Sequence, residues 1–242
     1  LKSQNPMNRL IQGDVGSGKT IVAILTAAIV IAEEYQVALM APTEILAEQH
    51  YASIKEYCEI VNIDCEIITS NTSKKEKEII LNKLKTGEIQ FIVGTHSLIQ
   101  DKVLFNNLGL IIIDEQHRFG VEHRKLLVDK GLNPEILAMT ATPIPRTLSI
   151  TLHGDMDISI IDELPKNRIP IKTELITPSK INSAYQKIKN EIKAGGQCFV
   201  VYPLIEESEK LDLEAADSGY KKLKKVFAEF QLGYINGKMK KE

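Results

Sequence analysis

The residues best suited to chemistry form a short glycine-rich stretch near the start of the chain, residues 13–20 (GDVGSGKT). This stretch matches the pattern G-x-x-x-x-G-K-[S/T], in which backbone N–H groups surround the phosphates of a nucleotide. Lys19 supplies a positive charge for the β- and γ-phosphates, and Thr20 supplies a hydroxyl for the shell of a Mg²⁺ ion. The residues that we expect to bind the nucleotide are Gly13, Gly16, Ser17, Gly18, Lys19 and Thr20.

A pair of acidic residues, Asp114 and Glu115, follows a uniformly apolar run about 100 residues further along the chain. A carboxylate at the end of a buried strand is suited to hold Mg²⁺ on the side opposite Thr20. The neighbouring glutamate is suited to orient and deprotonate a water that attacks the γ-phosphate. We therefore predict Glu115, Asp114 and Lys19 as catalytic residues, and Thr20 and Asp114 as metal ligands. The alternative for the acidic pair is a solvated loop.

Three further polar residues are predicted to couple the nucleotide to the rest of the protein. His117 follows the acidic pair, and Thr140 and Thr142 end the next buried strand. The threonine hydroxyls can hydrogen-bond the His117 imidazole, and this contact would depend on whether the γ-phosphate is present. His117 can also be a general base, or a metal ligand with His96 and His123, but the spacing matches no metal template. The alternative for the two threonines is an ordinary turn before a proline.

The elements that must position these residues are predicted from an alternation of apolar runs with amphipathic stretches. Strands are expected at residues 9–12, 37–40, 65–69, 91–93, 110–113 and 136–139. Helices are expected at residues 21–31, 43–59 and 73–85, the first of them buried and the last capped by Thr72 or Ser73. Uniformly apolar strands are typical of a parallel sheet covered on both faces, so we predict an α/β fold with a mostly parallel sheet flanked by helices. Ligands of such sheets bind at the carboxyl ends of the strands, and every candidate site here follows a strand.

The composition of the sequence changes near residues 161–180, where prolines and mixed charges indicate a linker. Beyond it we expect strands at residues 171–176, 197–201 and near 234–235, with a helix at 180–193 and a polar helical stretch. We therefore predict two domains, 1–165 and 166–242. The second is expected to be truncated, because about 70 residues cannot complete another sheet of this type.

Bulk composition narrows the class of protein. The chain has 242 residues with 43% hydrophobic and 26% charged content, ordinary for a globular protein. With a net charge of −2, a nucleic acid would have to be held by a local basic surface. The lysines among residues 74–77 and 221–225 are interpreted as solvated faces. No apolar run reaches the roughly 18 residues of a membrane span, and three cysteines without metal spacing favour buried free thiols in a reducing cytoplasm. The first residue is Leu, which suggests a piece of a longer protein.

Five segments resemble motifs I, Ia, Ib, II and III of superfamily 2 helicases: residues 13–20, 41–44, 94–96, 114–117 and 140–142. The longer runs 114–121 and 140–148 resemble the RecG family of bacterial ATP-dependent DNA helicases, which remodel stalled replication forks and branch-migrate Holliday junctions. The transcription-repair coupling factor shares much of this pattern, but it normally has Glu where Gln116 stands. The runs 161–165 and 202–213 also favour RecG. The resemblance covers essentially the whole chain.

The resemblance implies a RecA-like P-loop NTPase fold, with an ATP-binding helicase domain followed by the first part of a second RecA-like domain. It implies ATP and Mg²⁺ as cofactors, a bacterial cytoplasmic location, a monomer without membrane partners, and branched, forked or Holliday-junction DNA as the partner. It also assigns the DNA contacts to Pro42, Thr43, Gly94 and Thr95, where backbone N–H groups and hydroxyls after strands can bind phosphate. From the residues alone, both threonines are ordinary helix caps.

The resemblance further implies that a wedge domain, an adenine-contacting motif and an arginine finger lie outside the chain. We therefore expect these 242 residues to bind phosphate but to be nearly inert as an ATPase, with no unwinding activity. Three alternatives stay open: a regulatory nucleotide switch or binding module, a transcription-repair-coupling-type translocase on double-stranded DNA, and an RNA helicase, since nothing here reads a 2′-hydroxyl. The absence of an Asn-Lys-x-Asp motif counts against a GTPase.

Overall fold

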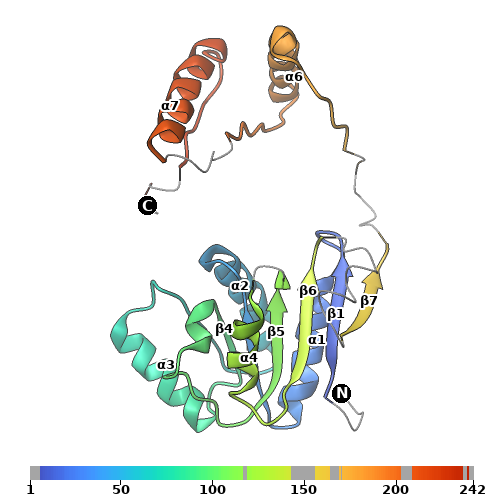
Figure 1. Ribbon diagram of the computed structural model, residues 1–242, viewed down its shortest axis with the longest axis vertical. Helices are drawn as coiled ribbons and strands as arrows, with labels where there is room; N and C mark the ends of the chain where they lie inside the picture. The colour runs from blue at the N-terminus through green and yellow to red at the C-terminus, as the bar shows by residue number, and fades with distance from the viewer. Residues whose placement is uncertain are drawn as a thin grey trace. The chain divides into compact units, whose positions relative to one another are not determined.

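The chain divides into two compact units in the computed structural model, Leu1–Arg168 and Ile169–Glu242 (Figure 1). The structure describes residues 6–116, 119–142, 156–163, 169, 171–202, 209–236 and 239. Within these ranges, none of the helices combines the length and the apolar content that crossing a bilayer requires.

The first unit is built on a seven-stranded sheet in the order β3-β4-β2-β5-β6-β1-β7. Its strands are β1 Asn8–Gly13, β2 Gln36–Met40, β3 Cys65–Ile68, β4 Phe91–Gly94, β5 Leu108–Asp114, β6 Glu135–Thr140 and β7 Asp157–Ile161. All the neighbouring strands run parallel. Every residue of β2 and β4 is buried, because helices cover both faces of the sheet. The predicted α/β fold with a parallel sheet is confirmed.

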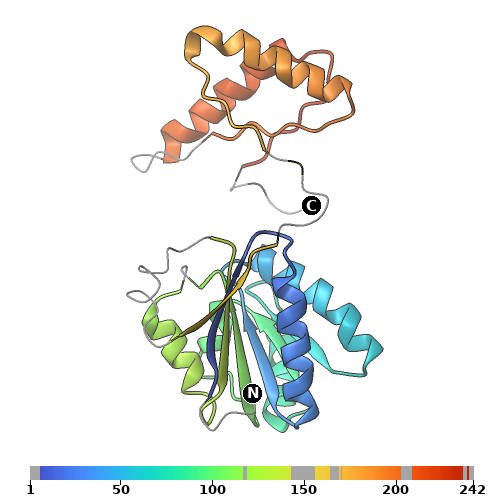
Figure 2. The same ribbon diagram turned by 90° about the vertical axis from the view of Figure 1, so that its right-hand side faces the viewer.

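The helices cover the two faces according to the direction in which the chain crosses the sheet. Their bounds are α1 Lys19–Ala32, α2 Glu44–Ile60, α3 Lys74–Thr86 and α4 Val121–Val128, with a 3₁₀ turn η1 at His96–Ile99. The chain passes from β1 to β2 and β3 in one direction along the sheet, and returns through β4, β5 and β6 in the other. Right-handed crossovers then require α1 and α2 on one face and α3, η1 and α4 on the other. Figure 2 shows α1 and α4 on opposite sides of the sheet, and two separate apolar clusters, one for each face, match this arrangement.

The predicted helices and strands of the first unit are found within two residues of their expected bounds, and Ser73 caps α3 in a capping box with Glu76. The expectation that the first helix is buried is wrong. Only one side of α1 packs on the sheet, and Ile21, Leu25 and Ile29 on its other side are 40%, 60% and 55% exposed. β7 and α4 were not predicted from the sequence. β7 lies at the edge of the sheet and has no fully buried residue, and α4 has only 8 residues, half of them polar.

Among its described residues, the second unit has two helices, α6 Ile181–Lys193 and α7 Glu209–Val226, preceded by a 3₁₀ turn η3 at Pro178–Lys180. The predicted helix at 180–193 is confirmed. The predicted strands at 171–176, 197–201 and 234–235 are wrong, because none of these segments pairs with another strand in the described part of the chain. Without a neighbouring strand, their apolar side chains are left uncovered: Leu175 is 99% exposed and Phe199 is 87% exposed.

The three cysteines also differ in exposure between the two units. Cys58 and Cys65 are buried free thiols as predicted, whereas Cys198 is exposed. The prediction is therefore wrong for Cys198, because it lies in one of the segments that no strand covers. The hydrogen bond with Cys58 raises the pKa of the Cys65 thiol, and burial raises it further.

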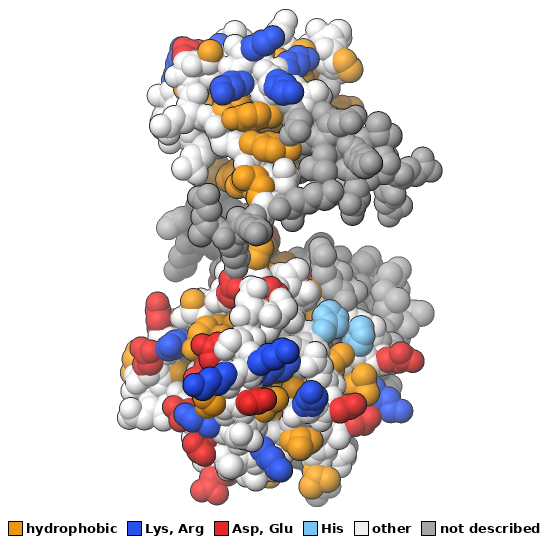
Figure 3. Space-filling view, turned by 90° about the vertical axis from the view of Figure 1, so that its left-hand side faces the viewer, with side chains coloured by type: hydrophobic (Ala, Val, Ile, Leu, Met, Phe, Trp, Pro, Cys, Tyr) orange, Lys and Arg blue, Asp and Glu red, His pale blue; other side chains and the backbone are white. Residues whose placement is uncertain are grey.

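Charged side chains are interspersed by sign on the surface of the first unit, on the face drawn in Figure 3. Lys74 and Lys75 on α3 are exposed, as are Lys221 and Lys225 on α7, which agrees with the interpretation of these lysines as solvated faces.

At the amino ends of the strands, the buried side chain of Gln36 joins three segments of the first unit. Its amide nitrogen donates to the carbonyl oxygens of Leu84 and Ile89 at 2.8 and 2.7 Å. Its carbonyl oxygen accepts from the backbone N–H groups of Asn106 and Asn107 at 2.7 and 3.0 Å. One side chain therefore satisfies four backbone groups near the end of α3 and the beginning of β5.

We predict that Gln36→Leu lowers the free energy of unfolding by about 3 kcal/mol or more, because it leaves four backbone groups without these partners. Urea or thermal unfolding measures the change. Gln100→Leu is the matched control, because Gln100 is exposed, and it should change stability by less than about 0.5 kcal/mol. Equal stability of the two variants would contradict the role given to Gln36.

Candidate active site

The candidate residues meet at the carboxyl edge of the sheet because neighbouring strands run parallel and in register. Gln12 of β1 lies beside Thr140 of β6, and Met139 of β6 lies beside Asp114 of β5. The phosphate-loop strand and the strand of the acidic pair are therefore two strand spacings apart, or about 10 Å. The loop and the acidic pair lie at the same edge and can contact one triphosphate.

The loop after β1 has the backbone that its glycines predict. Gly16 and Gly18 have φ angles of 80° and 95°, a region that L side chains rarely adopt. A Cβ on Gly13 would lie 2.6 Å from the Ser17 hydroxyl and 3.0 Å from Ile161, so there is no room for a side chain at that position. The loop closes with a hydrogen bond from the Ser17 N–H to the Asp14 carbonyl at 3.2 Å.

Lys19 folds back across this loop. Its ammonium group donates to the carbonyl oxygens of Gly13 and Asp14, both at 2.8 Å. The side chain is thereby fixed close to the loop backbone. The positive charge therefore lies beside the loop backbone, where it could contact the oxygens of a phosphate bound by the loop.

The loop fits a phosphate group by two further observations. Gly18 is the N-cap of α1 and provides no side-chain cap, and no acidic residue lies in the first turn, so the positive helix end is not offset locally. The hydroxyl of Ser17 is buried and makes no hydrogen bond with the described residues. Thr20, half-buried in the first turn of α1, adds a second hydroxyl beside the loop.

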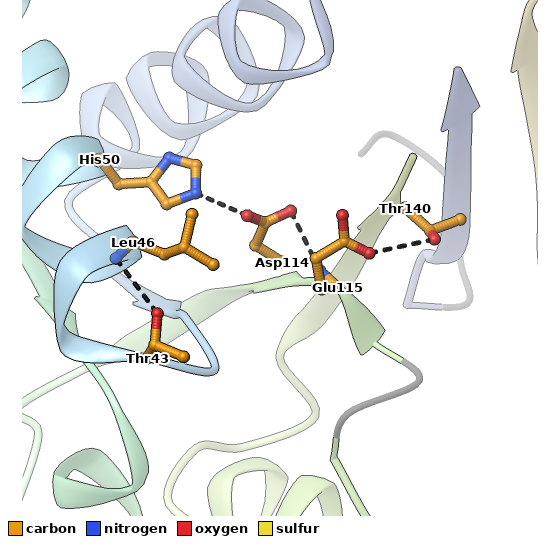
Figure 4. A network of polar contacts seen from close by, with 6 residues as sticks. All are labelled: Thr43, Leu46, His50, Asp114, Glu115 and Thr140. Carbon is orange, nitrogen blue, oxygen red and sulfur yellow. Dashed lines mark hydrogen bonds and ion pairs between the residues drawn. The ribbon is translucent and has the colours of Figure 1, made fainter. Parts of the chain in front are cut away.

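The acidic pair lies at the end of β5 in a network of polar contacts (Figure 4). One carboxylate oxygen of Asp114 accepts from the N–H of Glu115 at 3.0 Å. The other lies 2.7 Å from Nε2 of His50 on α2. Glu115 has a φ of 49°, in the left-handed region. A glutamate in this region is strained by about 1–3 kcal/mol, and such strain is commonly found at active sites.

The threonines at the end of β6 contact this pair. Oγ1 of Thr140 donates to a carboxylate oxygen of Glu115 at 3.4 Å and lies 2.9 Å from Oγ1 of Thr142. The N–H of Thr142 donates to the same Thr140 oxygen at 3.2 Å. The predicted contact with His117 lies outside the described residues and stays a prediction. The threonines thus reach the acidic pair through Glu115.

The predicted DNA-contact residues follow β2 and β4, which are neighbouring strands. Ala41, just before Pro42, donates its N–H to the Gly94 carbonyl at 2.9 Å. The hydroxyl of Thr43 caps α2 by accepting from the Leu46 N–H at 3.3 Å, whereas Thr95 precedes η1 without a side-chain cap.

Gly94 itself is required by packing. A Cβ there would lie 2.7 Å from Leu98 and 2.9 Å from the Ile68 carbonyl. The end of β4 therefore packs closely against η1 and against the end of β3.

The other histidines noted in the sequence form a ring contact on the opposite face from α1 and α2. The rings of His96 and His123 lie edge to face with centroids 4.9 Å apart, and His96 also contacts Phe119. Burial and the neighbouring His123 lower the pKa of His96. Within the described part of the chain, no three His, Cys, Asp or Glu side chains are grouped as metal ligands.

His50 was not identified from the sequence. A signal was present, because His50 falls on the apolar stripe of α2 that also contains Ala47, Ile54 and Cys58. A polar side chain on a stripe of this kind needs a buried hydrogen-bond partner. The partner, Asp114, is distant in the sequence and only the sheet topology brings it near.

Comparisons with known proteins agree with this geometry. The model of the DEAD/DEAH box helicase family matches residues 2–150. The ATP-dependent DNA helicase RecG of Aquifex aeolicus is 52% identical over 236 residues, which cover 97% of this chain and 30% of that protein. RecG of Synechocystis is 48% identical, with 99% of this chain and 29% of that protein covered.

A solved structure of RecG bound to a three-way DNA junction is 42% identical, with a TM-score of 0.75, and covers 93% of this chain and 29% of that one. The chain thus spans about 30% of the length of these relatives. It belongs to the DEAD/DEAH box helicase family, and over nearly its whole length it is similar to the RecG helicases.

Proposed function

We propose that this chain is the nucleotide-binding motor segment of a RecG-type ATP-dependent DNA helicase, in which ATP hydrolysis drives movement on branched DNA. The observation that carries the proposal is the meeting of the phosphate loop and the acidic pair at one edge of the sheet. The RecG relative bound to a three-way junction supports forked DNA and Holliday junctions as substrates. Residues 1–165 would be the ATP-binding domain, and 166–242 the beginning of a second RecA-like domain in a monomeric, cytoplasmic protein.

The phosphate loop would hold ATP through its backbone N–H groups and the Ser17 hydroxyl. The Lys19 ammonium would exchange its two carbonyl partners for oxygens of the β- and γ-phosphates. Thr20 and Asp114 are the proposed ligands of Mg²⁺, which when bound would neutralise charge on the phosphates. The buried Ser17 hydroxyl and the uncapped end of α1 support this assignment.

Glu115 is the proposed general base. Its backbone is held in the left-handed region, and Thr140 holds one carboxylate oxygen. A carboxylate fixed in this way can orient a water and accept its proton as the water attacks the γ-phosphate. Thr140 and Thr142, with His117, would then respond to the state of the nucleotide.

Pro42, Thr43, Gly94 and Thr95 are the proposed contacts with the DNA backbone. They lie on two neighbouring loops at the same edge of the sheet as the nucleotide site. Backbone and hydroxyl contacts of this kind bind phosphate without reading base sequence. A motor that moves along DNA requires contacts of that type.

We predict that Lys19→Ala weakens ATP binding by about 10- to 100-fold, the equivalent of one or two charge-assisted hydrogen bonds. Titration with a fluorescent ATP analogue measures the affinity, and circular dichroism verifies the fold. Lys83→Ala, at an exposed position of α3, is the control and should bind normally. Unchanged affinity in Lys19→Ala would place the nucleotide elsewhere and overturn the proposal.

We predict that Glu115→Gln binds ATP with an affinity within about threefold of the original protein but lowers turnover by about 10²-fold or more, because the amide cannot accept a proton. Turnover is measured in the full-length context and binding in the chain itself. Normal turnover in this variant would remove Glu115 as the base.

We predict that Thr43→Ala and Thr95→Ala have different effects. Loss of the α2 cap in Thr43→Ala should lower stability by about 1 kcal/mol. Thr95→Ala should leave stability within about 0.5 kcal/mol and weaken DNA binding severalfold for every sequence. Thermal unfolding and DNA titration in the full-length context measure both. Unchanged DNA affinity in Thr95→Ala would remove its hydroxyl from the interface.

A further inference from the structure

We propose that His50 is a positioning residue that fixes Asp114, the proposed metal-binding carboxylate, from the neighbouring helix α2. The inference rests on the proposed function, because it assigns a partner to one residue of that site. Nε2 of His50 lies 2.7 Å from Oδ2 of Asp114 (Figure 4). Both side chains are largely buried, with 12% and 13% of their surfaces exposed.

The direction of the hydrogen bond follows from the chemistry of the two groups. An ionised carboxylate only accepts, so Nε2 of His50 is the donor. The other oxygen of Asp114 accepts from the Glu115 N–H at 3.0 Å. The carboxylate is thus bonded on both oxygens, from two different elements, and its plane is fixed.

His50 is itself held by a rigid element. Ala47 and Ile54, one turn before and one turn after it on the same side of α2, are both 0% exposed. They pack in the apolar cluster that joins α2 to the sheet. A helix anchored in this way presents the imidazole in one orientation, which a residue on a mobile surface could not do.

The cost of placing a histidine on this stripe indicates that its role is more than packing. An imidazole on an apolar helix face loses water contacts that a leucine would not need. The bond to Asp114 offsets this loss and orients a group of the proposed site. Partners of metal-binding side chains typically change metal affinity by about 10- to 100-fold when removed.

The test is the Mg²⁺ dependence of nucleotide binding by the chain, followed with a fluorescent ATP analogue. His50→Leu should raise the Mg²⁺ concentration for half-maximal binding by about 10- to 100-fold, without changing affinity in EDTA. His50→Gln, whose amide N–H can replace Nε2, should stay within about threefold of the original protein. Tyr57→Leu, at an exposed position of the same helix, is the matched control.

A cycle with Asp114→Asn separates positioning from a general effect on the fold. If His50 acts through Asp114, His50→Leu should change the Mg²⁺ dependence by less than about twofold in the Asp114→Asn protein. Thermal unfolding in EDTA shows whether each variant is folded. If His50→Leu does not fold, His50→Gln still tests the inference. A shift of about 10-fold in the Mg²⁺ concentration for half-maximal binding by His50→Gln would overturn it.

Failure of this inference differs from failure of the proposed function. Normal Mg²⁺ dependence in folded His50→Leu, with ATP binding still sensitive to Lys19→Ala, would overturn only the role of His50. Loss of sensitivity to Lys19→Ala would overturn the proposed nucleotide site as well.

Discussion

The parallel pairing of the strands is the constraint on which the rest of the structure depends. Each strand runs parallel to the neighbours with which it is hydrogen-bonded, so all the carboxyl ends lie at one edge of the sheet. Residues separated by more than half of the first unit are thereby brought within reach of one another. Gln12 beside Thr140, and Asp114 beside Met139, are the register pairs that assemble the phosphate loop with the acidic pair.

The helices complete this arrangement from the two faces. α1 directs its uncapped amino end at the phosphate loop, and α2 brings His50 against Asp114. Both helices lie on the same face because both belong to connections that run in the same direction along the sheet, from β1 to β2 and from β2 to β3. The site is therefore built from the ends of strands and from the buried side of a helix, which makes its geometry a product of the core. At the opposite edge, Gln36 performs a comparable structural task by joining three segments.

Much of this architecture could be predicted because the informative residues are local. Residues 37–40 of β2 and 91–93 of β4 are apolar at every position, a pattern typical of a strand covered on both faces. The phosphate loop could be predicted from its glycines, since their φ values are ones that few other residues accept. Such signals are contained in a few consecutive residues.

The features that could not be predicted depend on partners elsewhere in the chain. β7 has a mixed pattern because it lies at an edge, and the extended segments of the second unit have apolar residues but no neighbouring strand. The same missing cover exposes Cys198, and the outward side of α1 is apolar without being packed. His50 belongs to this group as well, because its partner is 64 positions away in the sequence.

The folded-back position of Lys19 has a consequence for how tightly a nucleotide is held. The ammonium group already has two carbonyl partners, so a phosphate that recruits it replaces existing hydrogen bonds instead of adding new ones. The net gain in free energy is then smaller than a count of contacts in the complex would suggest. Because the Lys19 ammonium is hydrogen-bonded both with and without a ligand, release of the ligand leaves this charge with partners, which favours repeated cycles over permanent occupancy.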